Sequence, residues 1–382
     1  MTLAFINGRL PARDGFSAGS TVIVAGARIS AIVPAGDAPT RDARVIDLSG
    51  RLLLPGFIDS QVNGGGGVLF NDSPTVEGIR AIGAAHRRFG TTAFLPTLIS
   101  DDLAVLARAI QAVDAAIDAG VPGVLGIHIE GPFISEARKG VHDASRFLEL
   151  DHDMVGLLSS LKRGKTLMTL APETTSPDVI QRLADAGVIL AAGHTDATVA
   201  EIDIARAHGL TGFTHLFNAM SQLSAREPGT VGAALADPDS YCGIIVDGRH
   251  VDPRVLKIAL AAKRHDRFML VTDAMPCVGT SERTFQLQGR TITVEDGVCV
   301  DEQGTLAGAA LDMGQAVRNA VTLLDLGAAE AVRMASEYPA QFLGLGSSHG
   351  RIAAGLRADF VIADEALNVL ETWIGGERIA LT

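Results

Sequence analysis

The sequence predicts an α/β protein with two domains, a (β/α)8 TIM-type barrel and a small β-sandwich built from both chain termini. Eight short apolar runs, each followed by a stretch with helical spacing, predict the barrel. β-rich segments before the first run and after the last predict the sandwich. A hydrophobic content of 47% with one Trp and two Tyr indicates an aliphatic interior, which suits a sheet covered by helices.

We expect residues 1–52 and 346–382 to form the sandwich and residues 53–345 to form the barrel. In both terminal segments, short runs of β-branched and apolar residues alternate with turns that contain glycine. A doubly wound open sheet is the main alternative for the middle segment. The eight runs expected to form barrel strands are LLLPGFIDS, TTAFLPTLI, VLGIHIEG, TLMTLAPE, VILAAGHT, GFTHLFNA, YCGIIVDG and FMLVTDA.

Helix starts are predicted between these runs wherever a capping residue precedes a proline. These positions are Ser73-Pro74, Ser176-Pro177 and Asp252-Pro253. Apolar residues spaced at three and four predict a helix over residues 101–119. Residues 278–308 look like a β-hairpin excursion after the eighth run, and loops at this position lie on the catalytic face of a barrel. Helical spacing of the apolar residues resumes at about residue 312.

Charge and cysteine content exclude several classes of protein. The 32 basic and 44 acidic residues give a net charge of -12, which argues against a nucleic-acid or anionic-membrane surface. An anionic substrate therefore requires a local basic pocket. The three cysteines have no disulfide or zinc-site spacing. Neither a leader pattern nor a run of about 18 apolar residues occurs, so we expect a cytoplasmic protein that does not enter membranes.

Polar residues stand at the ends of the predicted barrel strands, where barrel enzymes carry their chemistry. The strand-end residues are Gln61, Asn63, Glu130, His194, His215, Asn218, Asp247, His250 and Asp273. Taken singly, a His in a turn or a Glu at a helix start has an ordinary structural explanation. One Glu and two His gathered at one barrel edge instead predict a site for zinc or iron(II), formed by Glu130, His194 and His215.

Two further residues near these strand ends have different expected roles. Asp273 follows four apolar residues, and a buried carboxylate beside a metal-activated water is suited to accept its proton. A structural cap is its alternative role. His128 lies two residues before Glu130 and therefore faces the same way along the strand. We expect His128 to be a hydrogen-bonding group of the core, one layer deeper than the metal.

The motifs resemble the amidohydrolase superfamily and, within it, the family of N-acetylglucosamine-6-phosphate deacetylases. The strings that carry the resemblance are PGFIDSQVNGGGG, GIHIEGPF, KGVHD, AAGHTDAT, THLFNAM, REPGTVGAAL, IVDGRHVDP, LVTDAM and TLAGA. The resemblance implies metal binding by Glu130, His194 and His215 and proton transfer by Asp273. It implies substrate contacts by Gln61, Asn63, Val141, His142, Asn218, Ala219, Arg226, Asp247, Gly248, Arg249, His250, Leu306, Ala307 and Gly308. Arg226 and His250 would hold the phosphate.

The same resemblance implies a homodimer in which His250 reaches the neighbouring subunit's site. One motif departs from the superfamily pattern, because the first strand ends in Gln61-Val62-Asn63 where His-x-His is usual. Amides are poor substitutes for imidazole, so we expect one divalent transition metal per subunit, with zinc favoured over iron(II). In the expected reaction, metal-bound hydroxide attacks the acetyl carbonyl and Asp273 returns the proton to the leaving amine.

Three other functions remain open. A related hydrolase would act on N-acetylgalactosamine 6-phosphate, and another on a cyclic amide or an N-acyl amino acid. Because the His-x-His pair is absent, the chain could also be a catalytically inactive barrel that serves as a binding or assembly protein. The presence of Glu130, His194, His215 and Asp273 argues against this function.

Overall fold

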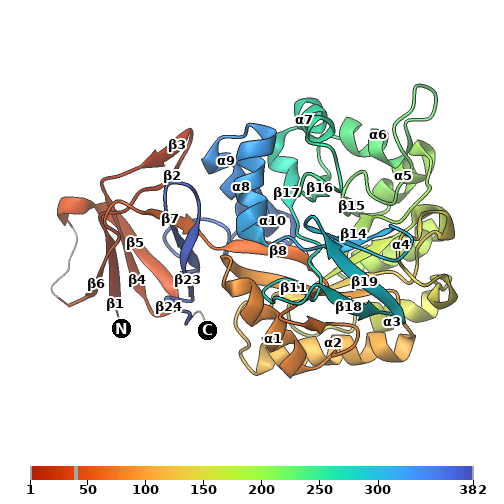
Figure 1. Cartoon of the computed structure of the whole chain (residues 1–382), viewed down its shortest axis with the longest axis horizontal. Coiled ribbons are helices and arrows are strands. Elements are labelled where there is room, and N and C mark those ends of the chain that lie inside the picture. Colours follow the sequence, from red (N-terminus) through yellow and green to blue (C-terminus); the bar gives the residue numbers. More distant parts are fainter. Residues whose placement is uncertain (1, 38–41, 381–382) are drawn as a thin grey trace.

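The computed structural model describes residues 2–37 and 42–380 of the chain (Figure 1). A small β domain lies beside a larger barrel of strands and helices, and both described ends of the chain belong to the small domain. Within the described residues, no helix has the length and apolar character needed to cross a membrane.

The small domain consists of two four-stranded sheets packed face to face. One sheet has the order β5-β4-β1-β6 and the other β24-β23-β22-β7. Between them, the ring of Phe5 meets those of Phe360 and Trp373 edge-on at centroid distances of 5.2 and 5.0 Å. The predicted sandwich of both termini is thereby confirmed. Its strands are β1 (Thr2–Ile6), β4 (Ser20–Ala25), β5 (Arg28–Pro34), β6 (Arg44–Asp47), β7 (Leu52–Pro55), β22 (Phe360–Ala363), β23 (Val369–Ile374) and β24 (Glu377–Arg378), beside a hairpin of β2 (Leu10–Ala12) and β3 (Gly15–Ser17).

Eight parallel strands form the barrel and follow one another in chain order, as predicted. They are β8 (Phe57–Val62), β11 (Thr91–Ile99), β12 (Gly126–Glu130), β13 (Lys165–Leu170), β14 (Ile189–Ala192), β15 (Leu210–Phe213), β16 (Tyr241–Ile244) and β17 (Phe268–Leu270). Just beyond β17, Val62 and Ala274 form a parallel bridge, and the Asp273 N–H donates to the Gln61 carbonyl at 3.1 Å. The first and last strands therefore meet through the residues that bear the expected chemistry.

The first predicted run, LLLPGFIDS, divides between the two domains. Its first half is β7, which pairs with β22 of the sandwich, and its second half is β8 of the barrel. Gly56 separates the two halves, and a Cβ atom there would lie 2.1 Å from the Thr92 hydroxyl oxygen. We propose that the domain boundary lies at Gly56, a few residues after the boundary expected from the sequence.

Helices surround the barrel strands, and five of those in the described residues begin with a side-chain cap. Ser176 and Asp252 cap their helices as predicted, since each accepts a backbone N–H. The predicted start at Ser73-Pro74 is wrong, because Thr75 takes the extended cap conformation and accepts the Gly78 N–H. The helices are α1 (Val76–Arg87), α2 (Leu103–Asp118), α3 (Val155–Leu158), α4 (Pro177–Asp185), α5 (Val199–Ala207), α6 (Gly229–Ala236), α7 (Pro253–Ala262), α8 (Met313–Leu324), α9 (Ala328–Met334) and α10 (Glu337–Phe342), with 3-10 turns at Ala35–Asp37, Glu136–Arg138, Ala144–Arg146, His152–Met154, Pro172–Thr174 and His265–Arg267.

The excursion after the eighth barrel strand is larger than the predicted hairpin. It is a four-stranded antiparallel sheet of β18 (Thr284–Leu287), β19 (Arg290–Glu295), β20 (Val298–Val300) and β21 (Leu306–Ala309). Its inner face packs on residues at the barrel end, including Ile99 and Met275, and β18 and β19 run across the barrel in Figure 1. A short two-stranded antiparallel ribbon, formed by β9 (Gly64–Gly65) and β10 (Val68–Leu69), follows β8 at the same end of the barrel.

Candidate functional site

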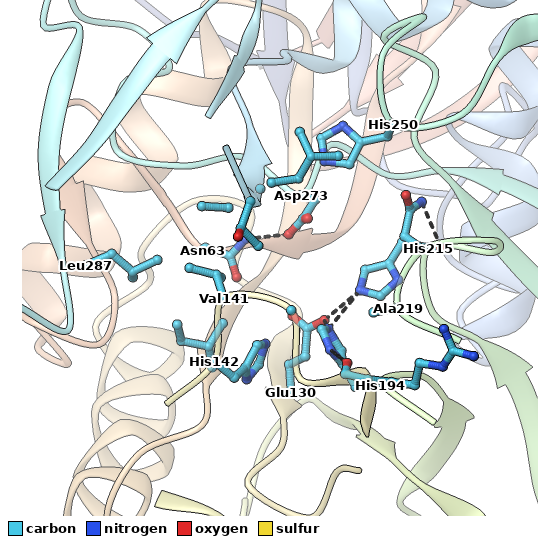
Figure 2. A pocket seen from close by; sticks show the side chains of 18 of the residues that line it. Asn63, Glu130, Val141, His142, His194, His215, Ala219, His250, Asp273 and Leu287 are labelled. Atoms are coloured by element: carbon cyan, nitrogen blue, oxygen red, sulfur yellow. Dashed lines mark hydrogen bonds and ion pairs between the residues drawn. The ribbon is translucent and has the colours of Figure 1, made fainter. Parts of the chain in front are cut away.

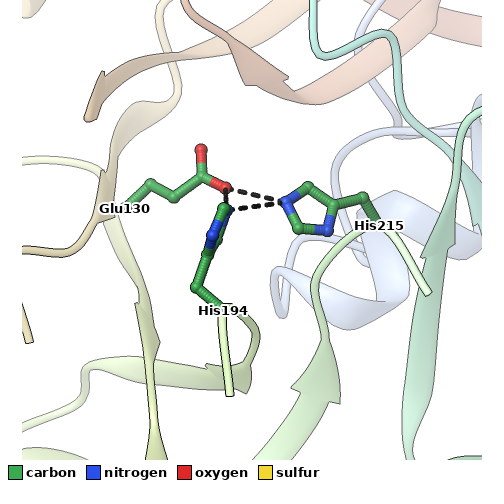
Figure 3. A group of neighbouring side chains, drawn as sticks. All are labelled: Glu130, His194 and His215. Atoms are coloured by element: carbon green, nitrogen blue, oxygen red, sulfur yellow. Dashed lines mark hydrogen bonds and ion pairs between the residues drawn. The ribbon is translucent and has the colours of Figure 1, made fainter. Parts of the chain in front are cut away.

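Glu130, His194 and His215 converge at the carboxyl end of the barrel (Figure 3). Glu130 is the last residue of β12, and the two histidines lie just beyond β14 and β15. Glu130 Oε1 lies 3.2 Å from His194 Nε2 and 3.0 Å from His215 Nε2, and the two Nε2 atoms are 3.2 Å apart. All three residues are buried, so these ligand-type atoms face one another rather than solvent.

Backbone conformation aims the two imidazoles at this point. His194 and His215 have φ values of 48° and 31°, a region that is sterically costly for residues with a side chain and is concentrated at functional sites. His194 Nδ1 lies 2.9 Å from the carbonyl oxygen of Arg138. Because a carbonyl only accepts, that nitrogen carries a proton, and in the neutral ring Nε2 holds the lone pair. This is the form of imidazole that binds a metal, so the donor set fits a divalent transition metal.

Glu130 and His215 shift each other's pKa. Burial by itself would raise the pKa of Glu130, but the imidazoles of His194 and His215 beside its carboxylate hold that pKa well below its usual range. Burial opposes protonation of His215, whereas its hydrogen bond with Glu130 raises the pKa of that imidazole. An anionic carboxylate facing two imidazoles favours positive charge at their common point, and a bound cation satisfies the same preference.

Asp273 lies beside this cluster on the segment that follows β17 (Figure 2). Its carboxylate accepts a hydrogen bond from Asn63 Nδ2 at 2.6 Å, and its φ is 52°. Burial, followed by repulsion from Glu130, raises its pKa to about 6. A carboxylate with a raised pKa beside a candidate metal site has the properties of a general base.

Gln61 and Asn63 connect the two carboxylates of the site. Gln61 Nε2 lies 3.1 Å from Glu130 Oε2 and 3.2 Å from Asp273 Oδ1. Both amides therefore donate N–H groups to anions. One layer deeper, His128 bonds to the hydroxyls of Thr97 and Thr169 at 3.1 and 2.8 Å, which confirms its predicted role as a core hydrogen-bonding group.

The cluster opens into a cavity of about 360 Å³ (Figure 2). Most of the residues predicted for the site line it. These are Asn63, Glu130, Val141, His142, His194, His215, Asn218, Ala219, His250, Asp273, Leu306, Ala307 and Gly308. Segments separated by up to 245 positions in the sequence, from Asn63 to Gly308, thus meet at one cavity. Burial, followed by repulsion from His194, lowers the pKa of His142 to about 3.

Five residues predicted to contact substrate stand outside the lining. Gln61 lies behind it, bonded to both carboxylates. Asp247 is buried against His250, whose Nδ1 it meets at 2.6 Å, and Gly248 follows with a φ of 74°. Arg249 is half exposed and pairs with Asp296 at 2.9 Å. Arg226 is exposed in the loop before α6.

Sequence reasoning missed several residues of the cavity wall. These are Ile99, Ala137, Arg138, Gly140, Met275, Leu287 and Thr305. Leu287 comes from the excursion, and no local pattern shows that β18 folds back over the barrel. Arg138 had a weak signal, since it lies in the segment between the Glu130 and His142 motifs. Its guanidinium pairs with Asp196 at 2.7 Å.

Residues 52–379 match the model of the amidohydrolase family, and the chain belongs to that family. The structure resembles a crystal structure of N-acetylglucosamine-6-phosphate deacetylase from Pasteurella multocida with a TM-score of 0.95, at 35% identity and over 100% of both chains.

Two curated relatives are similar over most of their length. One is an N-acetylgalactosamine-6-phosphate deacetylase of Shewanella sp. (strain ANA-3), 45% identical over 340 residues that cover 89% of this chain and 86% of the relative. The other is an N-acetylglucosamine-6-phosphate deacetylase of Haemophilus influenzae, 35% identical over 359 residues that cover 93% of each chain.

Proposed function

We propose that the chain hydrolyses the acetamide of N-acetyl-D-glucosamine 6-phosphate in amino-sugar catabolism, releasing acetate and D-glucosamine 6-phosphate. The observation that carries the proposal is the position of Asp273 beside the Glu130, His194 and His215 cluster, on the wall of one cavity. Similarity over nearly the whole chain to proteins named as deacetylases of phosphorylated N-acetyl amino sugars supports the choice of substrate.

The proposal places one divalent ion at Glu130, His194 and His215, with zinc as the first choice and iron(II) as the second. When bound, such an ion lowers the pKa of water and polarises a carbonyl oxygen. We assign a single ion because Gln61 and Asn63 turn their N–H groups toward carboxylates and offer only amide oxygens, which are weak ligands for zinc or iron(II).

Asp273 has the proton-transfer role in this proposal. Its carboxylate takes a proton from the attacking water and gives it to the nitrogen of the leaving amine. Asn63 and Gln61 donate N–H groups to Oδ1 of that carboxylate at 2.6 and 3.2 Å, which fixes its orientation. Burial and the charge of Glu130 raise the pKa of Asp273 to about 6 in the absence of a metal, and a bound cation would lower it, so the carboxylate is ionised at neutral pH and can accept a proton.

Substrate binding is proposed to use the remaining cavity residues, with Arg226 and His250 holding the phosphate. His250 lines this chain's own cavity, and its side chain is only 4% exposed. The homodimer in which His250 serves the neighbouring site stays a prediction. A cytoplasmic location also stays a prediction, supported by three free cysteines.

N-acetylgalactosamine 6-phosphate is a second candidate substrate. The 45% identity to the Shewanella N-acetylgalactosamine-6-phosphate deacetylase favours it specifically. The two sugars differ only in the configuration of one hydroxyl group, so the same residues would perform the same reaction on either.

The test is an acetate-release assay on protein whose metal content has been measured. The panel contains N-acetylglucosamine and N-acetylgalactosamine, each with and without the 6-phosphate, and the Asp273→Asn variant controls for contaminating activity. We expect turnover of a phosphorylated sugar that greatly exceeds turnover of its unphosphorylated form. Equal turnover of both forms, or acetate release only from N-acyl amino acids or cyclic amides, would contradict the proposal.

A further inference from the structure

Ser100 is a fully buried residue directly after β11, and none of the roles above uses it. Its hydroxyl oxygen lies 2.7 Å from Nδ1 of His142, and its backbone N–H donates to the same nitrogen at 3.4 Å. His142 is 3% exposed and lines the cavity, and its ring lies 4.4 Å from that of His194. Ser100 therefore contacts the cavity only through His142.

The backbone N–H of Ser100 fixes the tautomer of the His142 ring. A backbone N–H is always a donor, so the nitrogen that it approaches must supply a lone pair. A lone pair on Nδ1 means that the ring is neutral and carries its proton on Nε2. The serine hydroxyl must then donate to Nδ1 as well, because a proton on that nitrogen would meet the N–H group of Ser100.

The opposite end of the ring is free to act on a bound molecule. Within the described residues, Nε2 of His142 has no hydrogen-bond partner and is not enclosed by protein. An Nε2–H group at this position is a hydrogen-bond donor on the wall of the cavity that Glu130 and His194 also line (Figure 2).

The surroundings of Ser100 hold this arrangement in place. Gly131 leaves room for the hydroxyl, because a Cβ atom at that position would lie 2.3 Å from the Ser100 oxygen. On the other side, Gln288 Nε2 donates to the Ser100 carbonyl at 2.6 Å. Gln288 follows Leu287, so Ser100 contacts the His142 ring through its N–H and hydroxyl and the excursion that covers the cavity through its carbonyl.

We propose that Ser100 is a positioning residue that holds His142 as the Nε2–H tautomer, so that His142 donates a hydrogen bond to the carbonyl oxygen of the amide that is cleaved. The inference deepens the proposed function and rests on it for the identity of the substrate. His142 is the group that touches substrate, whereas Ser100 acts only through His142.

The tautomer is tested first, by nitrogen NMR of the metal-loaded chain labelled at histidine, with the His142→Gln variant assigning the signal. We expect a protonated Nε2 and an unprotonated Nδ1 in the wild-type chain, and a mixture of tautomers in Ser100→Ala. A proton on Nδ1 in the wild-type chain would overturn the proposal. The NMR measurement needs no substrate. Absence of acetate release would therefore contradict the proposed function, whereas the tautomer of His142 would still be decided by NMR.

Kinetics test whether the donor acts on the carbonyl. Ser100→Ala is expected to lower kcat for the N-acetyl phosphosugar about tenfold, and to lower it less than about threefold for the N-trifluoroacetyl analogue, whose carbonyl needs less polarisation. Ser336→Ala, which removes another buried hydroxyl that bonds to the Val332 carbonyl, is the matched control and should leave both rates unchanged.

A double variant separates positioning from packing. If Ser100 acts through His142, adding Ser100→Ala to the His142→Gln variant should cause no further loss of kcat. Equal losses on the two substrates, or an additive loss in the double variant, would show that Ser100 only supports the local packing and would overturn the proposal.

Discussion

Thr272 donates a 2.5 Å hydrogen bond from its hydroxyl to Asp59, and both side chains are fully buried where the first and last barrel strands meet. The same hydroxyl oxygen accepts the N–H of Ala274 at 3.2 Å. Asp59 also accepts the backbone N–H groups of Gln61 and Thr272. Asp273 stands between Thr272 and Ala274. The contact between Thr272 and Asp59 therefore closes the barrel and also fixes the backbone on both sides of the proposed base.

The first prediction concerns the Thr272 hydroxyl. Thr272→Val removes the shortest donor to a buried carboxylate and the acceptor of the Ala274 N–H. We expect the free energy of unfolding to fall by about 2 kcal/mol. We also expect kcat to fall at least about tenfold, because Asp273 loses its fixed position. Urea unfolding and steady-state kinetics measure the two effects. Thr272→Ser keeps the hydroxyl and is the control, and identical behaviour of the two variants would refute the prediction.

A second prediction uses the buried carboxyl of Asp59. Burial raises its pKa to about 7 from an ordinary 3.8. The folded chain therefore holds a proton there that the unfolded chain releases, and the stabilisation is complete below about pH 3.8 and lost as pH rises through about 7. Asp59→Asn removes this titrating group. The free energy of unfolding of the wild-type chain minus that of the variant should therefore fall as the pH rises from about 3.8 to about 7, by up to about 1.4 kcal/mol per pH unit.

Urea unfolding of the wild-type chain and Asp59→Asn across this pH range provides the measurement. The difference between the two proteins removes the contribution of every titrating group that does not interact with Asp59, and burial of Asp59 remains the largest cause of the difference. A difference that stays constant from about pH 5 to pH 7 would show that Asp59 titrates as it does in the unfolded chain.

The barrel and the cluster were predictable because their signals are local. An apolar run that ends in a polar residue marks a strand end, and the parallel fold brings Glu130, His194 and His215 together without further information. Ser100 directly follows the second run, TTAFLPTLI, and is therefore also a polar residue at a strand end, although it was not among the predicted site residues. The position of Leu287 was not predictable in this way, because it depends on how a distant excursion packs over the barrel.

The split of the first run at Gly56 shows another limit. Both halves are apolar and β-forming, so periodicity does not distinguish a sandwich strand from a barrel strand. Only pairing with β22 assigns Leu52–Pro55 to the small domain, and that partner lies about 300 residues away in the sequence. Likewise, Arg226 is an ordinary loop charge by sequence and stands exposed in the structure, so only the family resemblance assigns it a role.

A third prediction tests the metal cluster without relying on activity. Zinc added to metal-free protein should raise the free energy of unfolding, by about 2.7 kcal/mol when free zinc is 100 times its Kd. His215→Asn should abolish most of this gain, because it removes one of three ligands. His152→Asn, at a histidine that is 56% exposed, is the control and should respond as the wild-type chain does. An unchanged zinc response in His215→Asn would exclude the cluster as the binding site.

The fourth prediction separates the roles of base and ligand at Asp273. Asp273→Asn keeps the size of the side chain but removes the basic oxygen, so we expect turnover to fall at least about a thousandfold. Metal content, measured by elemental analysis, should remain near that of the wild-type chain because Glu130, His194 and His215 are intact. Loss of the metal together with activity would instead make Asp273 a ligand.

The last prediction compares two guanidinium groups near the cavity. Arg226 is exposed in the loop before α6, whereas Arg138 lines the cavity but is paired with Asp196. If Arg226 binds the phosphate, Arg226→Ala should raise KM for the phosphorylated sugar about 10- to 100-fold, as expected for loss of a charge-assisted hydrogen bond. KM for the unphosphorylated sugar should change far less.

Arg138→Ala is the matched control, because it removes a guanidinium whose charge Asp196 already neutralises at 2.7 Å. It should change KM for the two sugars to a similar extent, since the contact of Arg138 with His194 is made by its backbone carbonyl and survives the substitution. A KM effect of Arg226→Ala that is equal for both sugars would remove Arg226 from the phosphate site. A selective effect of Arg138→Ala would assign that site to the guanidinium already on the cavity wall.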